Sequence, residues 1–192
     1  MTAKLADLPL LEPADRAQWR GWLEQNHTTS QGVWLAIGKK GNPVTALSYE
    51  EAVREALAFG WIDSVVNRLD EHRFKQLFTP RRPGSVWALS NKRRVEELVE
   101  QGLMRPAGMA VIEAAKADGS WYSLDDVESL TVPDDLAEAL AADPRASRNF
   151  GAFTPSTRKM ILYWVAEAKR PETRASRIEQ TVRAAREGRP VR

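Results

Sequence analysis

The chain has 192 residues, a length that suits one large domain or two small ones and allows a substantial hydrophobic core. Hydrophobic residues make up 43% and charged residues 28%, which excludes wholesale disorder, and no apolar run is long enough for a transmembrane helix. The absence of cysteine excludes a disulfide framework, a thiolate nucleophile and a cysteine-based zinc site. Met1–Pro9 lack the features of a secretory signal, so we expect a cytoplasmic protein. We also expect no membrane insertion, no metal and no cofactor.

The first two thirds of the sequence predict a small antiparallel sheet with packed helices. Short apolar runs bounded by glycine or turn residues indicate strands, and apolar residues spaced three or four positions apart indicate helices. Ser48 and Glu51 have the spacing of a capping box, which marks the start of a helix. In chain order we expect a helix over Glu12–Glu24, a strand over 32–38, a turn over 39–43, a helix from Ser48 to Gly60, paired strands over Trp61–Leu69 and His72–Thr79, a helix capped by Ser90 that ends at Gly102, and a helix over Pro106–Gly119.

A polar, acidic stretch over Leu124–Val132 separates this part from a helical tail, and we expect a domain boundary there. Beyond it, the apolar positions predict three helices, over Pro133–Ala142, Pro155–Lys169 and Pro171–Glu187. These patterns indicate the α+β fold class, with a small antiparallel sheet and packed helices in a domain over residues 1–123. A short all-α domain is expected over residues 124–192.

Charge is distributed unevenly although the formal net charge is only +2. Residues 73–95 contain seven bases and no acid, and residues 120–143 contain seven acids and no base. Residues 155–192 contain ten bases and four acids. Such blocks can neutralise one another across a domain interface, or they can hold separate partners such as nucleic acid.

The segment from Phe78 to Lys92 has the most distinctive composition. Arg81 and Arg82, held between two prolines, form a preorganised pair of guanidinium groups for a carboxylate or phosphate, and Trp87 can stack on a ring or cation. In the alternative interpretation Trp87 covers the core and the arginines pair with acids of the C-terminal domain. The residues that we expect to bind ligand are Trp61, Arg81, Arg82, Ser85, Trp87, Asn91, Lys92, Lys116 and Trp121.

The outer members of this set have weaker signals. Asn91 and Lys92 lie at a helix start, where backbone N–H groups favour anions. Lys116 and Trp121 flank a helix end at which Gly119 serves as the C-cap. In one interpretation, Lys116 and Trp121 only belong to the helix end. In the other, they also form a further wall of an anion-accepting pocket.

Asp63 is the candidate catalytic residue, because it lies among apolar neighbours near the start of a predicted strand. A desolvated carboxylate can serve as a general base, and an architectural ion pair with Arg81, Arg82 or another arginine is the alternative. The two histidines, His27 and His72, do not have a metal-binding spacing. The sequence contains no nucleophile elbow, Walker loop or dinucleotide-binding glycine pattern.

Several long motifs resemble the YdeI/OmpD-associated (bacteriocin-protection) family. They include Trp19-Arg-Gly-Trp-Leu, Gly60-Trp-Ile-Asp, Phe78-Thr-Pro-Arg-Arg-Pro, Ala114-Ala-Lys-Ala-Asp-Gly-Ser-Trp and Tyr163-Trp-Val-Ala-Glu-Ala-Lys-Arg-Pro-Glu-Thr-Arg. The resemblance implies an association with bacteriocin protection and an outer-membrane porin, and it implies no reaction or catalytic residue. Many relatives carry a cysteine where this chain has Ala58, so any thiol chemistry of theirs is excluded here.

Three functional hypotheses follow. The first is a cytosolic binding protein with a pocket for a small anionic ligand between the predicted hairpin, the Pro80–Trp87 loop and the next helices. The second is an enzyme with Asp63 as general base and arginines that stabilise negative charge. The third is nucleic-acid binding through the basic blocks, although the acidic block should offset much of the positive field. The C-terminal helices could also dock a protein partner in a scaffold or stress-protection role.

Overall fold

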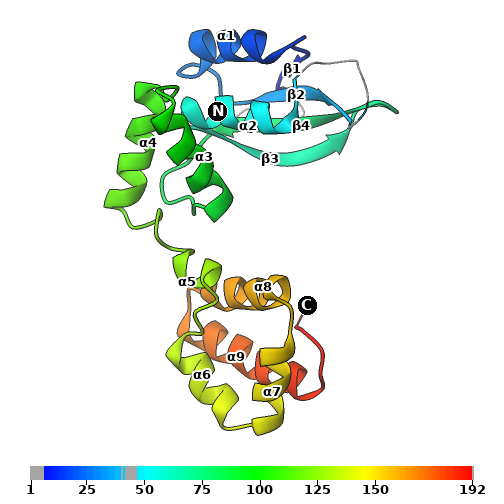
Figure 1. The fold of residues 1–192 in the computed structure, drawn as a ribbon, viewed down its shortest axis with the longest axis vertical. Coiled ribbons are helices and arrows are strands. Elements are labelled where there is room, and N and C mark those ends of the chain that lie inside the picture. Colours follow the sequence, from blue (N-terminus) through cyan, green and yellow to red (C-terminus); the bar gives the residue numbers. More distant parts are fainter. Residues whose placement is uncertain (1–6, 40, 42–46, 192) are drawn as a thin grey trace. The chain divides into compact units, whose positions relative to one another are not determined.

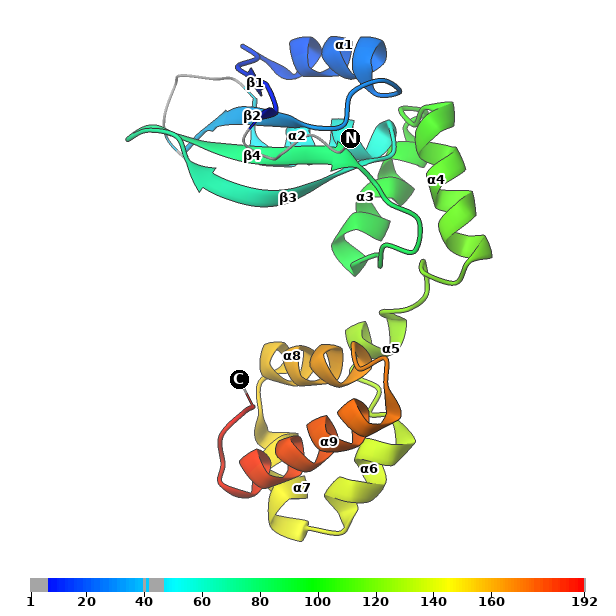
Figure 2. The same ribbon diagram turned by 180° about the vertical axis from the view of Figure 1, so that it is seen from behind.

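The computed structural model describes residues 7–39, 41 and 47–191. The chain folds into two compact units, Met1–Tyr122 and Ser123–Arg192 (Figure 1 and Figure 2). The first contains a sheet with helices and the second contains helices, so the predicted α+β class is confirmed. Of the predicted turn over 39–43, residues 40, 42 and 43 lie outside the described residues. No helix in the described ranges has the length and apolarity that crossing a bilayer requires.

The N-terminal unit contains a sheet with strand order β1-β2-β4-β3. The two-residue strand β1 runs parallel to β2 and had no counterpart in the prediction, because two residues are too few to show a periodic pattern. The other pairings are antiparallel. The elements of this unit are β1 (Leu10–Leu11), α1 (Arg16–Asn26), β2 (Val33–Gly38), α2 (Tyr49–Ala58), β3 (Trp61–Arg68), β4 (Arg73–Pro80), α3 (Leu89–Glu100) and α4 (Pro106–Ala117).

Local capping explains where the helices begin. Asp15 caps α1 by accepting a hydrogen bond from the Gln18 N–H at 2.9 Å, so the helix starts later than predicted. The predicted capping box of α2 is confirmed, because Ser48 and Glu51 each accept a hydrogen bond from the other's backbone N–H. The predicted cap of α3 is wrong. That helix starts one residue before Ser90, with Ala88 at the cap position and no side-chain hydrogen bond.

The predicted hairpin is present, and its register determines where Asp63 lies. Asp63 is opposite Phe78, so both side chains lie on the same face of the sheet, and a register shift follows between Asp63 and Val66. Directly after β4, the Arg81 N–H donates to the Gly60 carbonyl at 3.0 Å. This bond holds the residue that follows β4 against the residue that precedes β3.

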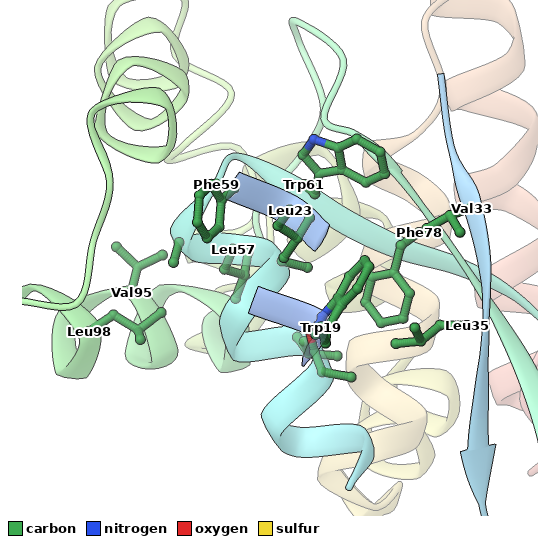
Figure 3. Close-up of a cluster of buried hydrophobic side chains, with 14 of the residues drawn as sticks. Trp19, Leu23, Val33, Leu35, Leu57, Phe59, Trp61, Phe78, Val95 and Leu98 are labelled. Atoms are coloured by element: carbon green, nitrogen blue, oxygen red, sulfur yellow. Dashed lines mark hydrogen bonds between the residues drawn. The ribbon is translucent and has the colours of Figure 1, made fainter. Parts of the chain in front are cut away.

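The core of the N-terminal unit lies between the sheet and helices α1 and α2 and extends to α3 and α4; Figure 3 shows part of it, with Val95 and Leu98 of α3. Trp19 is fully buried, its indole Nε1 donates to the Ala52 carbonyl at 3.0 Å, and its ring centroid lies 5.4 Å from that of Phe78. One tryptophan therefore contacts both α2 and β4, which places α1 and α2 on the same face of the sheet. Burial of large aromatic side chains such as Trp19 removes apolar surface from water and stabilises the unit.

The C-terminal unit consists of α5 (Asp125–Glu128), α6 (Asp134–Ala141), α7 (Pro144–Ala152), α8 (Pro155–Ala166) and α9 (Pro171–Arg186). Helix α7 was not predicted, because the polar stretch 144–152 buries only Ala146 and Phe150. Asp143 caps it by accepting hydrogen bonds from the N–H groups of Arg145 and Ala146.

Acids of the acidic block pair with bases of the C-terminal unit itself. The ion pairs are Glu128–Lys159 at 2.6 Å, Asp135–Arg174 at 2.6 Å and Asp143–Arg186 at 3.0 Å. Part of the acidic block is therefore neutralised within its own unit.

Two glycines provide a matched test of this packing. A Cβ at Gly108 in α4 would lie 2.3 Å from the Ala58 carbonyl oxygen, whereas a Cβ at Gly21 in α1 would meet nothing within 4 Å. Gly108→Ala should lower the free energy of unfolding of the N-terminal unit by about 1–3 kcal/mol. Gly21→Ala should raise it by about 0.5–1 kcal/mol, because alanine favours a helix interior. Urea unfolding followed by tryptophan fluorescence measures both, since six of the seven tryptophans belong to this unit. A shift in the same direction for both variants would contradict the packing.

Candidate functional site

The candidate site is built around Arg81, which follows β4 directly. Its side chain is buried, with 8% exposure, and its guanidinium carbon lies 3.7 Å from the ring centroid of Trp87. The Nη2 group donates to the Val86 carbonyl. The Nε and Nη1 groups are also buried, and they have no hydrogen-bond partner in the described part of the chain.

Burial is the main electrostatic influence on Arg81. It lowers the pKa of the guanidinium to about 10, against the raising effect of the Asp63 carboxylate, so the group stays charged at neutral pH. A buried charge with two unpartnered N–H nitrogens costs free energy, since those groups lose their hydrogen bonds to water. An acceptor that reaches these nitrogens would recover that cost, and neighbouring side chains must move to admit it because both atoms are sealed from solvent.

A cavity of about 60 Å³ lies beside this guanidinium. It is much smaller than the roughly 300–1,000 Å³ of a typical metabolite pocket. One water needs at least about 10–15 Å³ by this kind of measure, so the space suits a few waters or a single small anionic group. The lining residues are Arg81, Arg82, Pro83, Gly84, Ser85, Trp87, Val111, Ala114, Ala115, Asp118 and Ser120.

The two sides of the cavity are joined through Asp118, which the sequence reasoning did not select. One carboxylate oxygen accepts from the Gly84 N–H at 3.2 Å and the other from the Ser120 N–H at 2.8 Å. The hydroxyl of Ser120 is the largest cause that lowers the pKa of Asp118, and the N–H groups of Ser120 and Gly84 lower it further. The loop after β4 is thereby attached to the end of α4, a link across 34 residues of sequence that no local pattern could indicate.

Beside the cavity, a group of aromatic rings and lysines extends from Trp87. The ring centroids of Trp87 and Trp121 are 4.8 Å apart, and the ammonium groups of Lys92 and Lys116 lie 5.3 and 5.7 Å from the Trp121 ring. Lys92 is nearly buried, with 6% exposure. These contacts are of the cation–π kind, and they stabilise positive charge next to Arg81.

The structure thus brings together most of the residues selected from the sequence. Arg81, Arg82, Ser85 and Trp87 line the cavity. Lys92, Lys116 and Trp121 form the adjoining aromatic–cation group. Trp61 is buried in the core, where its indole donates to the His27 carbonyl at 3.1 Å. Asn91 accepts a hydrogen bond from Arg94 at 2.8 Å.

Asp63 lies apart from the cavity lining. Its carboxylate accepts a hydrogen bond of 2.7 Å from the hydroxyl of Tyr49 at the start of α2. Burial, followed by that hydrogen bond and the charge of Asp63, raises the pKa of Tyr49 to about 12. Within the described residues Asp63 forms no ion pair, and nearby Arg94 pairs instead with Glu50 at 2.7 Å. The partner of Asp63 is thus a tyrosine rather than the arginine that the architectural interpretation expected.

Across the ranges 7–39, 41 and 47–191, no group of three or more His, Cys, Asp or Glu side chains could hold a metal ion. The site at Arg81 offers hydrogen-bond donors, positive charge and aromatic faces.

The Tyr49–Asp63 hydrogen bond can be tested by titration. In Asp63→Asn the pKa of Tyr49 should fall from about 12 but remain above 10, because burial is the larger cause and persists. The pH dependence of the Tyr49 ring carbon resonance measures this. Glu100→Gln, at an exposed position of α3, is the control and should leave the titration unchanged. An identical Tyr49 pKa in wild type and Asp63→Asn would contradict the assignment.

Two family models match the chain. Residues 11–111 match a domain of unknown function (DUF8412), and residues 129–188 match the family described as bacteriocin-protection, YdeI or OmpD-associated. No curated protein and no solved structure gives a significant match. The predicted resemblance to the YdeI/OmpD-associated family is confirmed over residues 129–188, in the C-terminal unit. Because the first match covers more than half of the chain, the protein belongs to the DUF8412 family, and its C-terminal unit carries the YdeI/OmpD-associated match.

Proposed function

We propose that the protein is a binding protein that accepts the carboxylate or phosphate group of a small ligand in the cavity beside Arg81 and Trp87. The observation that carries this proposal is the buried, charged guanidinium of Arg81, with its Nε and Nη1 groups unpartnered among the described residues. A carboxylate or phosphate supplies negative charge and several acceptor oxygens at once. Water would supply acceptors without the charge.

The shape of the site supports entry of one anionic group rather than a whole metabolite. About 60 Å³ accommodates the charged end of a ligand, and the rest would lie over the exposed loop residues Arg82 to Gly84. Arg82 adds a second positive charge at this opening. The lysines around Trp121 add further positive charge beside a ring that packs at a tilt against Trp87.

Local pairing of the basic block favours a small anion over nucleic acid. Arg73 is held by Glu12 at 2.6 Å and by Asp70 at 2.8 Å, and Arg94 is held by Glu50. Lys75 lies 4.7 Å from the Trp34 ring centroid. Much of the basic block therefore has partners within the N-terminal unit, which reduces the charge available for a phosphate backbone.

The description of the family matched by residues 129–188 includes bacteriocin protection. We extend the proposal to that role: anion binding by the N-terminal unit would serve a protective activity of the whole chain in the cytoplasm.

The proposal is tested by titrating ¹⁵N-labelled full-length protein with inorganic phosphate and with acetate. Saturable shifts are expected at the Arg81 Nε–H and Trp87 indole N–H resonances. Ala114→Leu adds a side chain at the lining position Ala114 and should weaken binding by about tenfold or more, roughly 1.4 kcal/mol. Arg81→Lys should also weaken it, because lysine offers a single charged group in place of a planar fork.

Ala117→Leu is the matched control, because Ala117 lies on the same helix but outside the lining. It should bind like the wild type. The proposal fails if neither anion shifts the Arg81 and Trp87 signals, or if Ala114→Leu and Ala117→Leu bind equally well.

A further inference from the structure

A second cluster of arginines lies in the N-terminal unit, and it is organised by one buried carboxylate. Glu55 of α2 is 1% exposed. One of its oxygens accepts from Arg16 Nε and the other from Arg20 Nη1, each at 2.5 Å. Arg16 and Arg20 are four residues apart on α1, so one buried acid holds two guanidinium groups in fixed positions.

A third arginine joins them from the start of α4. Arg105 donates its backbone N–H to the Ala58 carbonyl at 3.0 Å and its Nη2 to Glu24 at 2.6 Å. The guanidinium carbons of Arg20 and Arg105 lie 5.6 and 6.0 Å from the ring centroid of Phe59. These contacts restrict the rotamers of Arg20 and Arg105, which lowers the entropy cost of binding to them.

The three arginines line one groove with a volume of about 620 Å³. This volume falls in the range of about 300–1,000 Å³ that is usual for small-molecule sites. The remaining lining residues are Ala17, Glu55, Gly102 and Leu103. Gly102 and Ala17 contribute little side-chain bulk, and Leu103 supplies an apolar surface. The groove therefore combines cations with a small apolar area.

The guanidinium groups of the groove keep N–H donors that an anion can use. Arg16 and Arg20 share Glu55, Arg105 pairs with Glu24, and the charge of Arg16 also helps to lower the pKa of Glu51. The Nη groups of Arg16 and the Nε and Nη1 groups of Arg105 have no hydrogen-bond partner among the described residues. Both side chains are about two-fifths exposed, with values of 40% and 43%. If the arginines served only to neutralise Glu55, the Nε group of Arg16 would suffice and Arg105 would not be needed, because Arg105 binds Glu24 instead.

From this arrangement we infer that the groove formed by Arg16, Arg20 and Arg105 is a second ligand site, for a small organic anion that carries a carboxylate or phosphate. The anionic group would bind to the outward N–H groups of Arg16 and Arg105, and the carbon skeleton would lie over Ala17 and Leu103. This site is lined by different residues from the cavity at Arg81, so its ligand is separate from the one proposed above.

Isothermal titration of the full-length protein with citrate and with 3-phosphoglycerate tests the inference. Saturable binding is expected for at least one of them, with shifts of the Arg16 and Arg105 Nε–H resonances in ¹⁵N-labelled protein. Arg105→Gln should weaken this binding by about tenfold or more, because it removes a charged hydrogen-bonding partner. It leaves the bonds from Arg16 and Arg20 to Glu55 intact, so its unfolding transition should stay close to that of the wild type.

Two further variants complete the design. Arg93→Gln removes an exposed arginine on α3 that does not line the groove, and it should bind like the wild type. Ala17→Leu narrows the groove without changing its charge and should weaken binding. The inference is overturned if neither compound binds saturably at millimolar concentration, or if Arg105→Gln binds as tightly as Arg93→Gln. Retention of the phosphate response of the Trp87 indole in Arg105→Gln would show that the two sites act separately.

Discussion

The stacking of the Arg81 guanidinium on the Trp87 ring is the interaction on which the candidate site depends. The backbone of Arg81 is held by the Gly60 carbonyl, so the stacked pair is fixed to the start of β3 as well as to the end of β4. The loop that carries Trp87 is attached to α4 through the Asp118 carboxylate. A charged group is thereby kept beside a small cavity, in surroundings where its attraction for an anion is screened far less than in water.

Local chemistry explains which parts of this arrangement could be predicted from the sequence. The capping box of Ser48 and Glu51 and the hairpin could be predicted, because a capping box spans only four residues and each hairpin strand pairs with its neighbour in the chain. The sequence also placed Arg81 and Trp87 in one short segment, because they are only six residues apart. The Glu55 cluster could not be predicted, because it joins α1 to α2 across 35 and 39 residues. Helix α7 was missed because its polar sequence buries only two apolar side chains.

Charge pairing within each unit neutralises part of the basic block and part of the acidic block. Asp135 and Asp143 pair with arginines of the C-terminal unit, and Arg73 and Arg94 pair with acids of the N-terminal unit. In the C-terminal unit the buried Nε of Arg158 has no partner among the described residues, and in the N-terminal unit unused N–H groups remain at the two arginine sites. They differ in kind: Arg81 is buried beside a cavity of about 60 Å³, and Arg16 and Arg105 are half exposed along a groove of about 620 Å³. The first suits one anionic group, and the second suits a whole small molecule.

The proposed function requires that the unpartnered N–H groups of Arg81 bind an anion. The most direct measurement is an anomalous difference map from a crystal of the full-length protein soaked in selenate, an analogue of phosphate that carries a strong anomalous scatterer. A selenium peak is expected in the cavity, with selenate oxygens within hydrogen-bonding distance of Arg81 Nε and Nη1. Ordered water alone at these nitrogens, with no anomalous peak, would contradict it and would leave Arg81 as a structural residue that packs on Trp87.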